Sequence, residues 1–204
     1  MLINPAQIEI PMPISTPRLL LRSKQPGDGA ATAVAVAETW TELHQWMQWA
    51  ENLEDLTAER IEARHRRVAA SFIRRELIEL IGIEIATGQP VIWTGFHDIN
   101  WETRECDTGF WVRKSAHNRG FATESTNALL RYAFEALGMR RVGITHSSGN
   151  EASRRVAQKL NFTPEGIIPA ANLLPEGKVA DRHCYSRFHA TGLPPLQVKW
   201  GVQD

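Results

Sequence analysis

The chain has 204 residues, and lysine plus arginine equals aspartate plus glutamate at 23 each. A hydrophobic fraction of 43% and this length are typical of one globular domain with a full core. The balanced charge argues against direct nucleic-acid binding, and no apolar run approaches the ~20 residues of a membrane span. The two cysteines, Cys106 and Cys184, lack disulfide-framework and metal-ligand spacing, and the N-terminus lacks a signal-peptide pattern, so we expect a metal-free cytoplasmic protein.

The N-terminal half of the chain predicts a strand followed by two helices. Residues 1–15 are rich in proline and are expected to run extended over the surface, and residues 19–22 then form a first strand. Helices are expected over 29–49 and 57–80, the second with glutamates at the positive end of its dipole. Glutamates balance the arginines of this second helix, which indicates a solvated face rather than a nucleic-acid site.

Short strand patterns and two helices make up the rest of the chain. Alternating or apolar runs predict strands at residues 81–86, 91–99, 106–112, 141–145, 162–168 and 183–188. A helix over 120–137 ends at Gly138, and a second helix opens at Asn150, a good N-cap residue. Residues 191–204 are polar and are expected to form a loose tail. This order predicts a mixed α/β fold with a mainly antiparallel sheet layered by helices, in a single domain over 1–204.

Residues 117–123, His-Asn-Arg-Gly-Phe-Ala-Thr, are the most informative stretch of the sequence. They lie between an apolar strand pattern and an amphipathic helix, so the loop aims unpaired backbone N–H groups at one point, backed by the helix dipole. Gly120 lets a bulky anion approach the backbone, and Ala122 keeps the next turn slim. No Walker lysine follows, and the full dinucleotide fingerprint is absent. From these seven residues alone, a phosphate-binding loop of another kind and an ordinary loop that contains a glycine both stay open.

Several ordered motifs around this loop resemble the coenzyme A core of the GNAT acetyltransferases. They are residues 107–112 (Asp-Thr-Gly-Phe-Trp-Val), 118–124 (Asn-Arg-Gly-Phe-Ala-Thr-Glu) and 132–142, which ends in Leu-Gly-Met-Arg-Arg-Val. The later Asn150-Glu-Ala-Ser153, the opening Thr-Pro-Arg-Leu at residues 16–19 and the late residues 181–186 are similar to the Rim-type (RimJ/RimL-like) branch. The resemblance covers about residues 16–190, which it implies are the core of the domain.

The resemblance implies a splayed pair of central strands, here 106–113 and 141–147, with acetyl-CoA wedged between them. It implies that the loop cradles the pyrophosphate, although His117 stands where the family pattern has arginine or glutamine. A backbone amide near Trp111 or Val112 is expected to hold the oxyanion. The implied cofactor-binding residues are Trp111, Val112, His117, Asn118, Arg119, Gly120, Phe121, Ala122, Thr123, Asn150 and Ser153.

Acetyl transfer to an amine needs a base, because amines are mostly protonated at neutral pH. Asp107 is the first candidate and stands where the Rim-type pattern usually has glutamate. Aspartate is one methylene shorter, so we expect it to act through a water. Glu84, in an apolar strand pattern, is the second candidate for the base.

The departing thiolate needs a proton, and the residues that deliver it differ between branches of the family. Many GNAT enzymes have a tyrosine where this chain has Ala157, whereas the Rim-type branch has a serine at the position of Ser153. We expect the Ser153 hydroxyl to donate to the coenzyme A sulfur, with Tyr185 as the alternative donor. Substrate contacts are expected from Trp46, Trp49 and Trp93, which would wall the acceptor site.

These motifs together predict an acetyl-CoA-dependent N-acetyltransferase that moves an acetyl group to a primary amine. The amine is a protein N-terminus or a small molecule, and it attacks directly in a ternary complex. The alternative is a non-catalytic acyl-CoA-binding sensor on the same fold, which the departures at Asp107, His117 and Ala157 keep open. The acceptor, the choice between acetyl and another short acyl group, and formation of a homodimer are also left open.

Overall fold

The computed structural model describes residues 4–201. Its strands are β1 Ile14–Ser15, β2 Leu19–Ser23, β3 Ile78–Glu84, β4 Gln89–Asn100, β5 Glu105–Val112, β6 Arg141–Ser147, β7 Thr163–Leu173, β8 Val179–Arg187 and β9 Lys199–Trp200. Its α-helices are α1 Asp28–Glu38, α2 Trp40–Trp46, α3 Ala58–Arg74, α4 Phe121–Arg131 and α5 Glu151–Lys159, and α4 continues into a π-helical turn, Tyr132–Ala136. Short 3-10 turns are η1 Pro5–Gln7, η2 Leu53–Asp55, η3 Lys114–Ala116 and η5 Pro175–Gly177.

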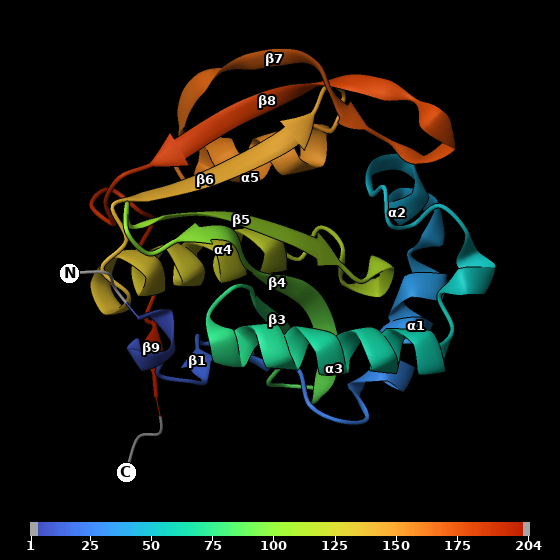
Figure 1. The fold of residues 1–204 in the computed structure, drawn as a ribbon, viewed down its shortest axis with the longest axis horizontal. Helices are drawn as coiled ribbons and strands as arrows, with labels where there is room; N and C mark the ends of the chain where they lie inside the picture. The colour runs from blue at the N-terminus through green and yellow to red at the C-terminus, as the bar shows by residue number, and fades with distance from the viewer. Residues whose placement is uncertain (1–3, 202–204) are drawn as a thin grey trace.

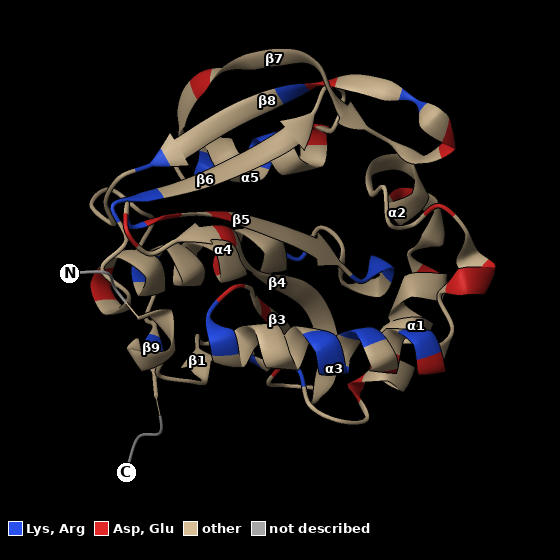
Figure 2. Ribbon diagram, viewed as in Figure 1, with Lys and Arg blue, Asp and Glu red and all other residues tan. Residues whose placement is uncertain are grey.

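One sheet organises the described part of the chain, with strand order β7-β8-β6-β5-β4-β3-β2-β1-β9. Helix α3 covers one face together with α1, whereas α4 and α5 lie on the opposite face (Figure 1). Basic residues run along α3, in keeping with the solvated face expected from its sequence (Figure 2). The observed fold confirms the predicted mixed α/β architecture with a mainly antiparallel sheet and helices on both faces.

Helix α4 lies at the centre of the core because most of its residues are apolar or small. Ala128, Leu129 and Leu130 are fully buried, and they belong to a cluster that includes Leu21 and Ile92 from the sheet. Even the polar residues of this helix, Ser125 and its neighbours through Asn127, are buried. The start of α4 is therefore held rigidly against the sheet.

Strands β5 and β6 form the one parallel pair in the part of the sheet that the structure describes, and they pair over a short distance only. Their partners are Glu105↔Arg141, Cys106↔Val142 and Asp107↔Gly143. Beyond Asp107 and Gly143 the two strands diverge, as Figure 1 shows toward its right-hand side. This splay opens beside the loop that leads into α4.

Two boundary predictions in the N-terminal half were wrong. The helix expected over 57–80 ends at Arg74, because Arg75 adopts a left-handed conformation with φ 64° and residues 78–80 join the sheet as β3. The helix expected over 29–49 is two helices, separated at Thr39, whose hydroxyl donates to the Ala35 carbonyl at 2.7 Å. A threonine hydroxyl that donates to the carbonyl four residues earlier slightly destabilises a helix and often bends it.

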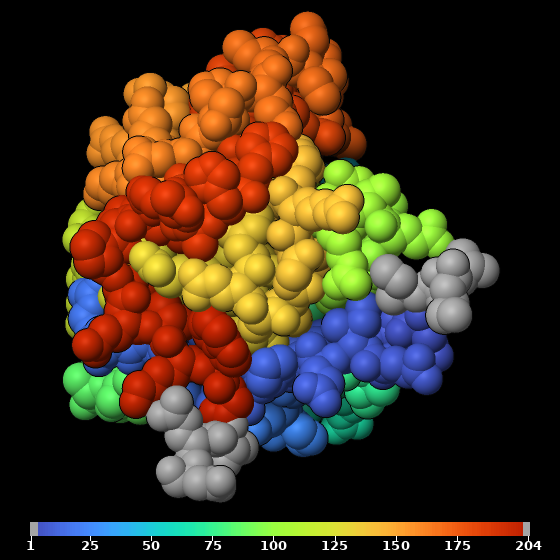
Figure 3. All heavy atoms as spheres, turned by 90° about the vertical axis from the view of Figure 1, so that its left-hand side faces the viewer, coloured from blue at the N-terminus to red at the C-terminus, as the bar shows by residue number. Residues whose placement is uncertain are grey.

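The expectation of a loose C-terminal tail is also wrong for the residues described. Leu193 is buried, and Trp200 pairs with Ile14 in the sheet and packs edge-on against Tyr132, with ring centroids 5.8 Å apart. Figure 3 shows this C-terminal segment (red) lying against the elements drawn in yellow and blue. Apolar residues spaced along a polar segment, rather than a regular period, anchor it. The parts of the two terminal expectations that concern residues 1–3 and 202–204 lie outside the described residues.

Candidate active site

The loop before α4 presents a row of backbone amides. Asn118 and Gly120 have left-handed backbone conformations, with φ 58° and 84°, and the first helical bond runs from the Glu124 N–H to the Gly120 carbonyl at 3.0 Å. Within the described residues, the amides of 118–123 donate to no acceptor, and no side chain caps the helix. His117 does not face this row, because its Nε2 donates to the Val112 carbonyl at 2.8 Å. The arrangement fits a phosphate group at the helix N-terminus.

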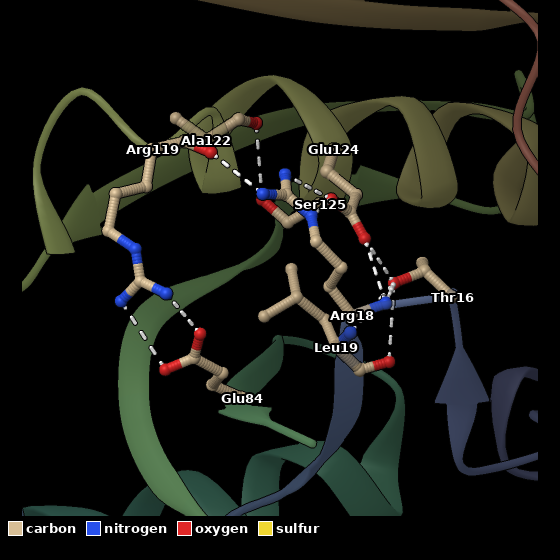
Figure 4. Close-up of polar contacts among 8 residues, drawn as sticks. All are labelled: Thr16, Arg18, Leu19, Glu84, Arg119, Ala122, Glu124 and Ser125. Carbon is tan, nitrogen blue, oxygen red and sulfur yellow. Dashed lines mark hydrogen bonds and ion pairs between the residues drawn. The ribbon is translucent and has the colours of Figure 1, made fainter. Parts of the chain in front are cut away.

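Two arginines flank this loop, and each is held by a carboxylate (Figure 4). Arg18 donates through Nε to Glu124 Oε2 at 2.6 Å and through Nη1 to the Arg119 carbonyl at 2.9 Å. Arg119 pairs with both carboxylate oxygens of Glu84. Both guanidinium groups lie 4.8 Å from the centroid of the Phe121 ring. The arginines are half-exposed, so they place positive charge beside the amides while their carboxylate partners fix their positions.

The position of Glu84 does not support its expected role as a base. It lies at the end of β3, beside the loop, and β4 separates its strand from β5. Its two oxygens accept from Arg119, and one of them also accepts from the Thr87 hydroxyl at 2.9 Å. The hydrogen bond from Arg119 lowers the pKa of Glu84, although partial desolvation opposes that shift. Glu84 is therefore built to hold Arg119.

Asp107 lies where the splay begins. Its carboxylate rests over Gly143 on β6, where any side chain would collide with it. Oδ1 lies 3.4 Å from Arg141 Nη1, and Arg141 in turn donates to Glu165 on β7 at 2.7 Å. Asp107 thus has the location expected of it, but an ion pair with Arg141 occupies one of its oxygens.

Tryptophans wall one side of β5. The rings of Trp93 and Trp111 stack with centroids 4.0 Å apart, and Trp49 lies 6.2 Å from Trp111. Trp93 is buried and donates through Nε1 to Thr32 at 3.1 Å, so it has little surface to offer to a substrate amine. Trp49 is exposed at the rim, and Trp46 reaches the loop before α5, where its Cη2 lies 3.4 Å from a Cβ position at Gly149. The wall consists of Trp49 and Trp111, with Trp93 supporting it from below.

The residues expected near the coenzyme A sulfur lie in two groups. Asn150 caps α5, because its side chain accepts from the Ser153 N–H at 3.1 Å, and the half-buried Ser153 lies in the first turn. Tyr185 lies on β8 opposite Ile144, with its hydroxyl 3.4 Å from His146 Nε2. Burial lowers the pKa of His146. Because the His146 Nδ1 donates to the Ser147 carbonyl at 3.0 Å, Nε2 is the acceptor of the tyrosine hydroxyl.

Strand β4 carries a histidine–aspartate pair that was not predicted from the sequence. His97 Nδ1 lies 2.8 Å from Asp98 Oδ2, and Asp98 has a positive φ of 49°. The pairing of β4 with β5 shifts register between His97 and Asn100, so this is a bulge. An aspartate in a strand pattern is unfavourable and was the signal available for it.

The comparison with protein families agrees with this geometry. The family model described as "Acetyltransferase (GNAT) domain" matches residues 18–163. The chain belongs to the GNAT acetyltransferase family. It is therefore an acetyltransferase enzyme, and the resemblance seen in the loop motifs is confirmed.

Two of the three relatives described next are named as ribosomal N-acetyltransferases. "Putative ribosomal N-acetyltransferase YdaF" of Bacillus subtilis is 28% identical over 151 residues, which cover 72% of this chain and 79% of the relative. A structure of RimL, a ribosomal L7/L12 α-N-protein acetyltransferase in complex with coenzyme A, has a TM-score of 0.78 at 22% identity and covers 86% of this chain and 96% of that one. The acetyltransferase MccE, in complex with acetyl-CoA and AMP, has a TM-score of 0.74 at 17% identity, with 84% and 93% covered. These two structures share the fold of this chain.

Other chemistry finds little support in the structure. Burial raises the pKa of the Cys106 thiol to about 12, so this cysteine is poorly suited to act as a nucleophile.

Within residues 4–201, no helix is long and apolar enough to cross a membrane.

Proposed function

We propose that this enzyme transfers the acetyl group of acetyl-CoA to a primary amine, with both substrates bound when the amine attacks. The observation that carries the proposal is the row of unpaired amides at 118–123 directly beside the splay of β5 and β6. The unpaired amides suit a phosphate group. The extended pantetheine arm of coenzyme A would lie between β5 and β6, where the two strands no longer pair. The family assignment favours this function over the non-catalytic sensor.

Residues along the splay between β5 and β6 are placed to contact acetyl-CoA. The amides from Asn118 to Thr123 would hold the pyrophosphate, and Arg18 and Arg119 add positive charge beside it. When bound, acetyl-CoA supplies an acetyl group activated as a thioester. Beyond Asp107 the backbone of β5 lacks partners on β6, so an amide near Trp111 or Val112 is available to donate to the acetyl oxygen.

Ser153 is the proposed proton donor to the sulfur, and Tyr185 is the alternative. Ser153 lies half-buried in the first turn of α5, on the helix that Asn150 caps. The Tyr185 hydroxyl already donates toward His146, so it would have to leave that partner to reach the sulfur. This difference places Ser153 first.

The acceptor is proposed to be the amine of a protein N-terminus or of a small molecule. The name of one relative supports the protein class, since RimL is named for ribosomal L7/L12, whereas MccE is named for microcin C7 self-immunity. The rim formed by Trp49 and Trp111 suits an acceptor with an apolar or flat group next to its amine.

A screen of thiol release tests the proposal. The protein is incubated with acetyl-CoA and a panel of amines and N-terminal peptides, including peptides from ribosomal proteins. We expect at least one acceptor to release thiol above the rate of hydrolysis and to carry an acetyl group by mass spectrometry. Tight coenzyme A binding without turnover on any acceptor would favour the sensor instead.

A further inference from the structure

A bulge at the end of β4 orients a histidine with a carboxylate beside it. Asp98 has a left-handed backbone, an arrangement that costs free energy for a residue other than glycine. It brings Oδ2 to 2.8 Å from His97 Nδ1. An ionised carboxylate only accepts hydrogen bonds, so a neutral His97 carries its proton on Nδ1 and leaves a lone pair on Nε2.

The free nitrogen of His97 lies over β5. A Cβ placed at Gly109 would be 3.6 Å from Nε2 and 4.0 Å from Cδ2, so the ring crosses from β4 onto β5. Asp107 is the last residue of β5 that pairs with β6, and Gly109 lies two residues beyond it, so Gly109 borders the splay. Any longer side chain at Gly109 would crowd Nε2, whereas glycine leaves it open. Within residues 4–201, Nε2 has no hydrogen-bond partner.

His97 also lies on the face where an acceptor would arrive. Cross-strand partners share a face of the sheet, and His97 pairs with Asp107 just as Trp93 pairs with Trp111. Along β5 this face presents the Asp107 carboxylate, then His97 over Gly109, then the tryptophan wall. The His97 side chain is 45% exposed, so a substrate amine and water can both reach it.

We propose that His97 is the general base of the acetyl transfer, with Asp98 as its positioning residue; this rests on the proposed function. Asp107 is held by Arg141 and Glu84 by Arg119, whereas His97 Nε2 is free. Imidazole is the side chain that serves most often as a general base.

The protons of the reaction balance with His97 in this role. An acceptor ammonium group carries three hydrogens, and the amide product of a primary amine keeps one. His97 Nε2 takes a proton from the nitrogen and passes it to solvent through its exposed edge. The nitrogen bonds to the acetyl carbon, and the carbon–sulfur bond breaks with its electron pair on sulfur. The thiolate takes the proton of the Ser153 hydroxyl, and the second proton lost by the nitrogen replaces it on Ser153. No oxidant or metal is needed.

Alanine substitution tests the role of His97, with Asp107→Asn as the comparison. We expect His97→Ala to lower kcat/KM on the order of 10²-fold while coenzyme A affinity by calorimetry is unchanged. Added imidazole should restore part of the rate of His97→Ala, which a purely structural role would not allow. Asp107→Asn should lose much less. If His97→Ala stays within about threefold of the parent, or imidazole restores nothing, the proposal is wrong.

The positioning role of Asp98 has a readout independent of activity. Nitrogen-15 NMR of the imidazole, recorded above neutral pH, should show His97 protonated on Nδ1 in the parent protein. Asp98→Asn should shift the tautomer population toward Nε2–H and lower kcat more than it changes KM. An unchanged tautomer would overturn the role of Asp98. If the parent protein itself transfers no acetyl group to any amine, the proposed function has failed, and His97 as its base fails with it.

Discussion

At the scale of single residues, Gly120 is the residue that keeps the loop before α4 open to a phosphate group. Its φ of 84° is left-handed, and the nearest atom to a Cβ there is Arg18 Nη2 at 3.4 Å. A side chain would therefore stand between the amides and the arginine that flank the expected phosphate. The sequence predicted this loop because glycine, helix start and strand end coincide in seven residues. It could not predict the two arginine–carboxylate pairs, since Glu84 and Glu124 are far from their partners along the chain.

Gly120→Asp should lower coenzyme A affinity by about tenfold or more, because it adds a negative charge where the phosphates bind. Gly138→Asp is the matched control, since Gly138 has a φ of 65° beyond the opposite end of the same helical segment. Isothermal calorimetry on both variants checks the prediction, with circular dichroism to confirm folding. If Gly120→Asp and the parent bind coenzyme A with equal affinity, the phosphates do not bind at this loop.

Ser153→Ala should lower kcat by a larger factor than it weakens coenzyme A binding, because the hydroxyl acts when the sulfur departs. Asn150 accepts from the backbone N–H of residue 153, so the cap on α5 survives this change. Steady-state kinetics of Ser153→Ala and Tyr185→Phe, measured together, provide the check. Full turnover in Ser153→Ala combined with loss in Tyr185→Phe would assign the proton to Tyr185.

At the scale of elements, α3 is docked on the sheet through a group of charges that the sequence did not reveal. Lys24 is buried and pairs with Glu79, which also accepts from Arg64 at 2.6 Å. His65 is buried next to them, and desolvation, aided by Lys24 and Arg64, lowers its pKa to about 4. The sequence indicated only a solvated face for the arginines of α3. The helical period shows which residues share a face, but it does not show that Arg64 pairs with Glu79 on β3.

His65 should make the fold sensitive to mild acid. Its folded-state pKa lies below the ordinary value of 6.5, so the unfolded chain binds the proton first. Stability is therefore full above pH 6.5 and falls as the pH drops toward 4. His65→Gln should remove on the order of 2 kcal/mol of this loss, as measured by urea unfolding between pH 6.5 and 4.5. Parallel pH profiles of the two proteins would contradict the buried neutral imidazole.

At the scale of the whole molecule, the sequence predicted the order of the layers better than the ends of the helices and strands. Strands 91–99 and 106–112 were placed within one or two residues, because apolar runs bounded by turn residues mark them well. The tail was not predictable, because contacts distant in sequence hold it in place. The pair of His97 and Asp98 is local, and the aspartate in a strand pattern was a signal for it. Residues 199–200 become a strand only because β1 offers an edge.

Trp200→Ala should therefore destabilise the fold although it lies far from the splay. The ring is half-buried against Tyr132, so we expect a loss of about 1–2 kcal/mol and a fall in Tm of about 2–8 °C. Differential scanning calorimetry gives the Tm, and coenzyme A affinity should stay as in the parent. A Tm within about 1 °C of the parent would mean that the C-terminal segment does not stabilise the sheet.

The central claim is that the loop at 118–123 delivers an acetyl group, across the splay, to an amine. Mass spectrometry of an acceptor after incubation with acetyl-CoA labelled in the acetyl group tests this claim most directly. With acetyl-CoA kept below the Kd of the parent protein, we expect label in an amide on the acceptor's amine, formed by the parent protein and reduced about tenfold or more in Gly120→Asp. Coenzyme A binding with no label in any acceptor, or equal labelling by Gly120→Asp, would contradict it.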